Sequence, residues 1–164
     1  MRVEHDILLA EAAPGGAQVS EGQLWAALVL RAYEPGRFMP ALQGCAIVER
    51  SHTEAGHVRL KRRLDFGSFV VADEATLIAP SRLVMQTQAG PSWPASVLTI
   101  GIEGPPNGPM ALRFCYELDE AGDSQLDAMT QALRAQAYRA ADRDMVLRVV
   151  ALANAGDLLA ITGA

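Results

Sequence analysis

Hydrophobic and polar residues alternate with a period of two along the middle of the chain and with a helical period on either side of it. Between Cys45 and Asp119, runs of alternating residues are separated by short groups of Gly, Pro and Ser. This pattern predicts strands at about residues 45–52, 57–66, 69–79, 82–89, 95–103 and 110–119. Because short turns join these strands, we expect them to form an antiparallel meander.

One further strand and two helical regions are predicted outside this meander. Residues 3–10 alternate as a strand does. Ser20, with Gln23 three residues later, is typical of a helix start, and Pro35 ends that helix. A short helical piece is expected at residues 37–42. A long helix is predicted over residues 124–155, where Ser124 and Asp127 form a capping signature.

The order of these elements predicts the fold class. The long helix carries a stripe of apolar residues at helical spacing: Leu126, Met129, Leu133, Ala137, Ala141, Met145, Val149 and Leu152. This stripe needs an apolar partner, and the sheet is the partner available. We therefore expect an α+β fold, with a seven-stranded curved antiparallel sheet around a long C-terminal helix and one or two short helices after strand 1. Residues 1–164 are expected to form one domain.

A hairpin is predicted at Gly67 and Ser68, because a two-residue turn with glycine first favours the type II′ geometry. Lys61 and Glu74 would then face each other on the solvent side as an ordinary surface ion pair. The turn fixes the pairs on the other, mainly apolar face: Phe66 with Phe69, Leu64 with Val71, Arg62 with Asp73, Leu60 with Ala75 and Val58 with Leu77.

The predicted Arg62–Asp73 pair is unusual because it lies on the apolar face of the hairpin. Burying two ions is unfavourable unless they are paired and hydrogen-bonded. One interpretation is a satisfied buried ion pair, or a pair near an open rim. The other is that the pair lines a cavity and gives an apolar ligand one polar anchor, since ligand pockets combine apolar walls with few polar groups.

Other polar residues are weaker candidates. Tyr116 shares the inward face of the last strand with Phe114, and its hydroxyl needs a partner when buried. Asp142 and Asp144 lie among arginines of the long helix, and solvated helix pairs explain them. Asp144 also borders the apolar stripe, so it could reach a cavity edge. Trp93, in a loop flanked by prolines, is expected to cover either a pocket mouth or the sheet edge.

Composition narrows the function classes. Half of the residues are hydrophobic and a fifth are charged, which is typical of a soluble globular protein. The net charge of −5 argues against a nucleic-acid binder. No apolar run is long enough to predict membrane insertion. Residues 1–13 place acidic residues before a short apolar patch, unlike a signal peptide, so we expect a cytoplasmic protein.

Cysteine and histidine positions predict no cofactor. Cys45 and Cys115 are far apart and in no CxxC pattern, so we expect free thiols rather than a disulfide or a zinc site. The three histidines have no metal-ligand spacing. A homodimer through an exposed strand edge is compatible with the pattern, although the sequence does not show one.

The chain resembles the AtaL-like SRPBCC family, within the helix-grip superfamily of START and birch-pollen-allergen proteins. Four parts of the sequence carry the resemblance: residues 23–32 with Pro35, Phe38 and Pro40, residues 58–71 with the Phe66-Gly67-Ser68-Phe69 turn, residues 114–118, and residues 138–144. The resemblance implies a cavity between the sheet and the C-terminal helix, suited to a hydrophobic small molecule. Many relatives are binders or carriers, and some are polyketide aromatase/cyclases.

Three functions are compatible with the sequence, which does not decide between them. The first is a protein that binds a small hydrophobic or amphipathic molecule in the cavity. The second is a cyclase- or hydratase-like enzyme that uses the same cavity, with Asp73, Asp144 or Tyr116 as acid or base. The third is a partner-binding module. The residues expected at the ligand are Leu60, Arg62, Leu64, Phe66, Phe69, Val71, Asp73, Phe114, Tyr116, Met129, Leu133 and Asp144.

Overall fold

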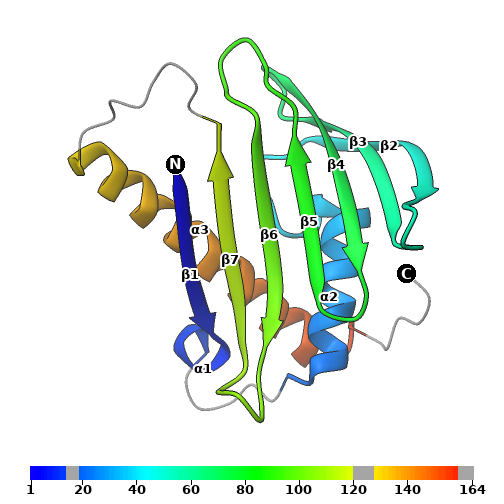
Figure 1. Ribbon diagram of the computed structural model, residues 1–164. Coiled ribbons are helices and arrows are strands. Elements are labelled where there is room, and N and C mark those ends of the chain that lie inside the picture. The colour runs from blue at the N-terminus through cyan, green and yellow to red at the C-terminus, as the bar shows by residue number, and fades with distance from the viewer. Residues whose placement is uncertain (14–18, 120–127, 159–164) are drawn as a thin grey trace.

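The computed structural model describes residues 1–13, 19–119 and 128–158 (Figure 1). Its strands form one antiparallel sheet in the order β1-β7-β6-β5-β4-β3-β2. The strands are β1 (Arg2–Leu8), β2 (Gly44–His52), β3 (Val58–Asp65), β4 (Val70–Ile78), β5 (Arg82–Thr87), β6 (Ser96–Glu103) and β7 (Ala111–Leu118). The expected seven-stranded antiparallel sheet is confirmed.

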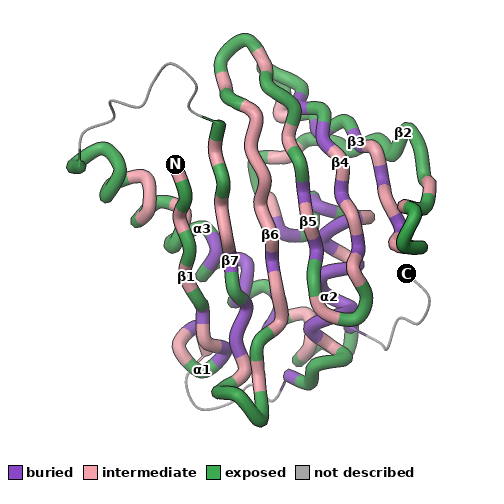
Figure 2. The backbone as a smooth tube through the Cα atoms, viewed as in Figure 1, coloured by how far each residue is buried: buried purple, intermediate pink, exposed green. Residues whose placement is uncertain are grey.

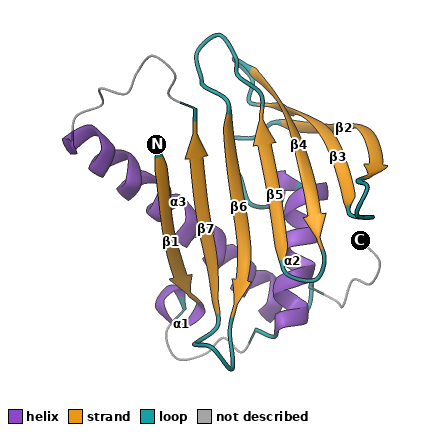
Figure 3. Ribbon diagram, viewed as in Figure 1, coloured by secondary structure: helices purple, strands orange, loops and turns teal. Residues whose placement is uncertain are grey.

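The helices lie on one side of this sheet, as Figures 1 and 3 show. They are α1 (Leu9–Ala12), α2 (Glu21–Tyr33), the 3-10 turn η1 (Pro35–Arg37) and the long α3 (Ala128–Asn154). Helix α2 begins where the sequence predicts. The Ser20 hydroxyl accepts from the Gln23 N–H at 3.1 Å, and the Gln23 side chain accepts from the Ser20 N–H at 2.9 Å.

Two details differ from the sequence prediction, and a third prediction falls outside the described residues. The first strand ends at Leu8, and the next residues form α1 instead of continuing to residue 10. The helical piece expected at residues 37–42 is the turn η1, which begins earlier because Pro35 has a backbone angle suited to a first helical position. Ser124, Leu126 and Asp127, which were expected to begin the long helix, lie outside the described residues.

The hairpin between β3 and β4 has the predicted register. Arg62 pairs with Asp73, Leu64 with Val71 and Leu60 with Ala75. One side-chain prediction was wrong, because the amino group of Lys61 lies 3.3 Å from Glu49 of β2 rather than bonding to Glu74. Lys61 has a strand on either side, and the carboxylate of Glu49 on the edge strand is the one it reaches.

The densest part of the core lies between α2 and the inner face of the sheet (Figure 2). The α2 side chains Leu24 and Leu28 are fully buried there, as are Leu60 of β3 and Ile100 of β6. Leu60 was expected at the ligand, but it belongs to this packed core. Side chains fill the sheet face directly beneath Leu24 and Leu28, and Ile100 at the border of this core also lines an open pocket.

The apolar stripe of α3 is buried only in its C-terminal half. Met145 and Val149 are buried, whereas Met129 and Leu133 are 74% and 60% exposed. In Figure 1 the first turns of α3 extend past the edge strand β1. Helical periodicity identifies a face of a helix but not how far the sheet reaches beneath it, so the predicted placement of Met129 and Leu133 at the ligand was wrong.

A buried ion pair ties α2 to the sheet. The Arg62 Nε and Nη2 atoms donate to the two carboxylate oxygens of Asp73 at 2.8 and 2.5 Å. Its Nη1 donates to the backbone carbonyls of Ala32 at 2.8 Å and Arg31 at 3.4 Å, in the last turn of α2. These carbonyls have no partner within a helix, and a cation also complements the helix dipole there. Arg62 thus joins β3, β4 and α2 at one point.

We expect the Arg62→Met variant to lower the free energy of unfolding by about 3–5 kcal/mol, because it leaves the Asp73 carboxylate buried without its partner. The double variant Arg62→Met with Asp73→Leu removes both charges and should regain most of that loss. Urea denaturation followed by circular dichroism measures both values. A double variant no more stable than Arg62→Met would contradict the assignment of the loss to an unpaired charge.

Candidate functional site

Two adjoining pockets lie between the inner face of the sheet and the helices. The first has a volume of about 430 Å³ and extends from β6 and β7 to α3. The second has a volume of about 380 Å³ and extends beneath β3 to β6. Arg31, Met39, Leu98 and Tyr138 line both pockets. Together the two form one site-sized space of the kind that holds small molecules in proteins.

Nine of the twelve predicted ligand residues line these pockets. In the second pocket they are Arg62, Leu64, Phe66, Phe69, Val71 and Asp73. In the first they are Phe114, Tyr116 and Asp144. The other three do not line either pocket: Leu60 lies in the core under α2, and Met129 and Leu133 are exposed. The hairpin register is the reason that the predicted residues of β3 and β4 lie together in one pocket.

Aromatic side chains form much of the pocket walls. The ring of Phe69 stacks on Phe66 with centroids 5.1 Å apart and contacts Trp93 at 5.4 Å. The Trp93 indole N–H donates to the Gln88 carbonyl at 3.0 Å, which holds the loop in place. Of the two roles expected for Trp93, the structure therefore supports the one at the pocket. In the first pocket, Tyr116 and Tyr138 are stacked at 4.1 Å.

A chain of hydrogen bonds ends at the first pocket. The Tyr116 hydroxyl donates to Asp142 Oδ1 at 2.6 Å, and His5 Nε2 lies 2.7 Å from Asp142 Oδ2. The prediction that Asp142 is a solvated helix residue is wrong, because Asp142 is buried. It stands three and four residues before the buried Met145 and Val146, a spacing that places all three on one helix face.

The surroundings of this chain of hydrogen bonds shift the pKa values of Asp142 and Tyr116. Burial raises the pKa of the Asp142 carboxyl above its usual value, although the hydrogen bonds from Tyr116 and His5 act in the opposite direction. Burial also raises the pKa of the Tyr116 phenol, and the negative charge of Asp142 raises it further. Tyr116 therefore holds its proton more strongly than a free tyrosine, and Asp142 is a stronger base than an exposed aspartate.

Arg31 is a polar residue of the site that the sequence patterns did not indicate. It is only 9% exposed in the last turn of α2, and its side chain lines both pockets. Among the described residues, its Nη1 is the buried side-chain atom without a hydrogen-bond partner. Burial, and then the charge of Arg62, lower the pKa of Arg31 to about 10, so it stays positively charged at neutral pH. Arg31 follows the buried Leu28 by three residues, and this helical spacing is the feature of the sequence that could have indicated its burial.

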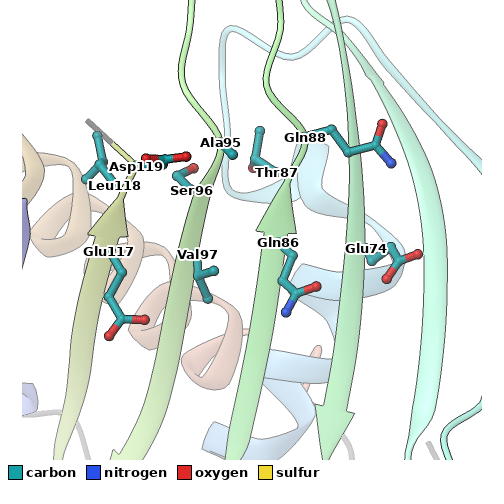
Figure 4. Close-up of a pocket in the computed structure, with 10 residues that line it drawn as sticks. All are labelled: Glu74, Gln86, Thr87, Gln88, Ala95, Ser96, Val97, Glu117, Leu118 and Asp119. Atoms are coloured by element: carbon teal, nitrogen blue, oxygen red, sulfur yellow. The ribbon is translucent and has the colours of Figure 1, made fainter. Parts of the chain in front are cut away.

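A third depression, of about 580 Å³, lies on the opposite, outer face of the sheet (Figure 4). Its walls come from β4 to β7 and include Glu74, Gln86 and Glu117. Figure 4 shows these polar side chains extending from the outer surface of the strands. Its lining has no aromatic side chain, whereas aromatic side chains line both inner pockets, so we place the candidate site on the inner face.

The fold and the inner pockets define a helix-grip protein of the START and SRPBCC class. The chain matches the family model "AtaL: Acetylaranotin biosynthesis cluster protein L" over residues 10–156, and it belongs to this family. The resemblance given by the sequence motifs is confirmed. A comparison with curated protein sequences finds no match.

Solved structures show the same fold. The crystal structure of Ara h 8.0201 matches with a TM-score of 0.62 and 13% identity, covering 92% of this chain and 98% of that one. The di-domain ARO/CYC StfQ from the steffimycin biosynthetic pathway matches with a TM-score of 0.62 and 10% identity, covering 94% and 51%. A START superfamily protein from Mycobacterium smegmatis matches with a TM-score of 0.55 and 14% identity, covering 92% and 98%.

Within the described part of the chain, the helices are too short or too polar to span a membrane.

The raised pKa of Asp142 makes stability depend on pH in a definite direction. A carboxyl with a raised pKa in the folded state favours folding most below its unfolded pKa of about 3.9. This contribution is lost as the pH rises through the folded pKa. Carbon-13 NMR of the Asp142 carboxyl should therefore show a midpoint above about 3.9. A midpoint at or below that value would contradict the assignment of burial as the dominant effect.

Proposed function

We propose that this protein binds a small hydrophobic or amphipathic molecule in the two inner pockets. The observation that carries the proposal is the pair of adjoining pockets along the inner face of the sheet, whose exposed lining surface is mainly apolar and includes aromatic rings. The packed core under α2 supports the adjoining strands, so the space does not depend on a ligand for its walls. The family and the fold neighbours agree with a role of this kind.

The polar groups of the site support an amphipathic ligand more than a purely apolar one. Arg31, Tyr116 and Asp142 occupy the middle of the space and the wall of the first pocket. The aromatic residues Phe66, Phe69 and Trp93 contact one another and line the second pocket but not the first. A molecule with a polar group near α2 and an apolar body toward Trp93 would match this distribution.

Binding can be tested with N-phenyl-1-naphthylamine, a neutral apolar dye that becomes fluorescent in dry pockets. We expect saturable binding at one site. In the Leu98→Trp variant, a larger side chain on the wall that the two pockets share would occupy part of their volume. This variant should bind the dye roughly tenfold more weakly, or by about 1.4 kcal/mol. Fluorescence titration measures both affinities, and native mass spectrometry of the purified protein shows whether a small molecule already occupies the site.

The neighbouring Val97 provides the matched control. It lies on the outer face of the same strand, among the residues of Figure 4. The Val97→Trp variant adds the same ring outside the proposed site, so dye affinity should stay within about twofold of the unchanged protein. Equal losses in both variants, with both proteins folded by circular dichroism, would show that the dye binds outside the inner pockets.

A second candidate function is acid–base catalysis in the first pocket, and the Tyr116–Asp142–His5 chain favours it. Tyr116 oxygen could take a proton from carbon next to a substrate carbonyl while its own proton moves to Asp142. The resulting enolate would expel a β-hydroxyl group, which leaves as water with the proton held on Asp142. The nearby guanidinium of Arg31 would stabilise the enolate charge. This is a dehydration of the kind that a hydratase-like or cyclase-like enzyme performs.

The test substrate is 4-hydroxy-4-phenylbutan-2-one, whose dehydration gives a product that absorbs ultraviolet light. We expect the protein to accelerate this reaction and Tyr116→Phe to reduce the acceleration by roughly 10²-fold or more. The same variant should still bind the naphthylamine dye. Absence of acceleration would contradict the catalytic function, and acceleration that survives Tyr116→Phe would contradict the role of Tyr116 in it.

A further inference from the structure

We propose that Arg31 is the recognition site for a single carboxylate, so that the ligand of this protein is an apolar carboxylic acid bound as its anion. This inference rests on the proposed binding function and adds the chemical class of the ligand. It starts from a contrast between the two buried arginines of the site, Arg62 and Arg31. The guanidinium of Arg62 is fully hydrogen-bonded, whereas a buried nitrogen of Arg31 has no hydrogen-bond partner among the described residues.

Arg62 is fully engaged by the protein. All three of its guanidinium nitrogens donate hydrogen bonds, two to Asp73 and the third to the end of α2. The hairpin pattern in the sequence raised this pair as a ligand anchor. The pair lines the second pocket, but its charge is neutralised and its donors are used, so it is a structural pair with a surface on the pocket.

Arg31 is left without such partners. Its backbone carbonyl accepts from Arg62, which fixes the position of the residue, but within the described residues no acceptor bonds to its buried Nη1. A buried cation without a hydrogen bond is unfavourable, and folded proteins rarely retain one. A ligand that supplies an acceptor to this guanidinium would remove that cost, and the pockets on both sides of Arg31 provide the access.

The charges around Arg31 select a monoanion. The Asp73 carboxylate, neutralised by Arg62, and the Asp142 carboxyl, bonded to Tyr116 and His5, both act electrostatically on Arg31. Arg148 and Asp144 also line the first pocket, but both are exposed. At the buried Arg31, a dianion such as a phosphate monoester would meet one unpaired cation and two nearby acidic side chains. A planar carboxylate needs only one guanidinium, to which it can bond through both oxygens. The stacked rings of Tyr116 and Tyr138 favour a flat body behind it.

The proposal can be tested with two ligands of equal shape, 2-naphthoate and 2-naphthamide. Each is titrated against the protein by displacement of N-phenyl-1-naphthylamine. We expect naphthoate to bind roughly tenfold or more tightly than naphthamide, because a hydrogen bond between charged groups exceeds a neutral one. In Arg31→Met, which keeps an unbranched side chain but removes the guanidinium, this preference should vanish, while naphthamide affinity should change by less than about threefold.

Two further variants separate charge from packing. Arg31→Lys keeps the charge and should retain part of the preference for naphthoate. Arg82→Met removes the same charge from an exposed position on β5 that lies outside both pockets, and should leave the preference unchanged. We also expect Arg31→Met to unfold at a temperature no lower than the unchanged protein, because it removes an unsatisfied buried cation.

The outcomes distinguish this inference from the function on which it rests. If the dye binds and the two naphthalene compounds bind equally, the protein is a binder but the carboxylate site is wrong. If Arg31→Met lowers the affinity for both compounds by the same factor, Arg31 acts by packing, and this result also overturns the inference. If neither the dye nor either compound binds, the proposed function itself fails.

Discussion

The structure depends on the hydrogen bonds of one buried guanidinium. Arg62 is placed on the inner face of β3 by the hairpin register, and Asp73 faces it across the β3–β4 ladder. The remaining donor of Arg62 reaches the last carbonyls of α2, which have no helical partner. An ion pair within a sheet therefore also positions a helix over that sheet. The contact adds a polar attachment between the end of α2 and strands β3 and β4, next to the apolar core that packs the rest of the helix on the sheet.

The same contact determines where the chemistry of the site lies. Arg62 holds the backbone of Arg31, and the side chain of Arg31 then lies between the two pockets. The neighbouring Arg62–Asp73 pair contributes little net charge, so Arg31 keeps an uncompensated one. On the other side, Asp142 is held by Tyr116 and His5 and forms the acid–base part of the site. The binding that we propose thus depends on Arg31, whereas the proposed second function, catalysis, depends on Tyr116.

The sequence predicted the sheet well and the helix faces incompletely, for physical reasons. Gly67 and Ser68 restrict the hairpin to one register, and with that register six of the residues predicted at the ligand, Leu64 and Val71 among them, line one pocket. A helical sequence contains no comparable feature that determines which part of the helix other elements cover. Met129 and Leu133 continue the apolar stripe but extend past the sheet, while Asp142 and Arg31 are charged residues at buried helical positions. Their burial results from neighbours distant in sequence, which periodicity does not specify.

A crystal structure of the protein with 2-naphthoate gives the most direct test. We expect the carboxylate within hydrogen-bond distance of the Arg31 guanidinium, the naphthalene rings between Leu98 and Tyr138, and Arg62 still bonded to Asp73 and the Ala32 carbonyl. An inner face filled by protein side chains, with the guanidinium of Arg31 turned to bulk solvent, would contradict both the binding site and its charged anchor.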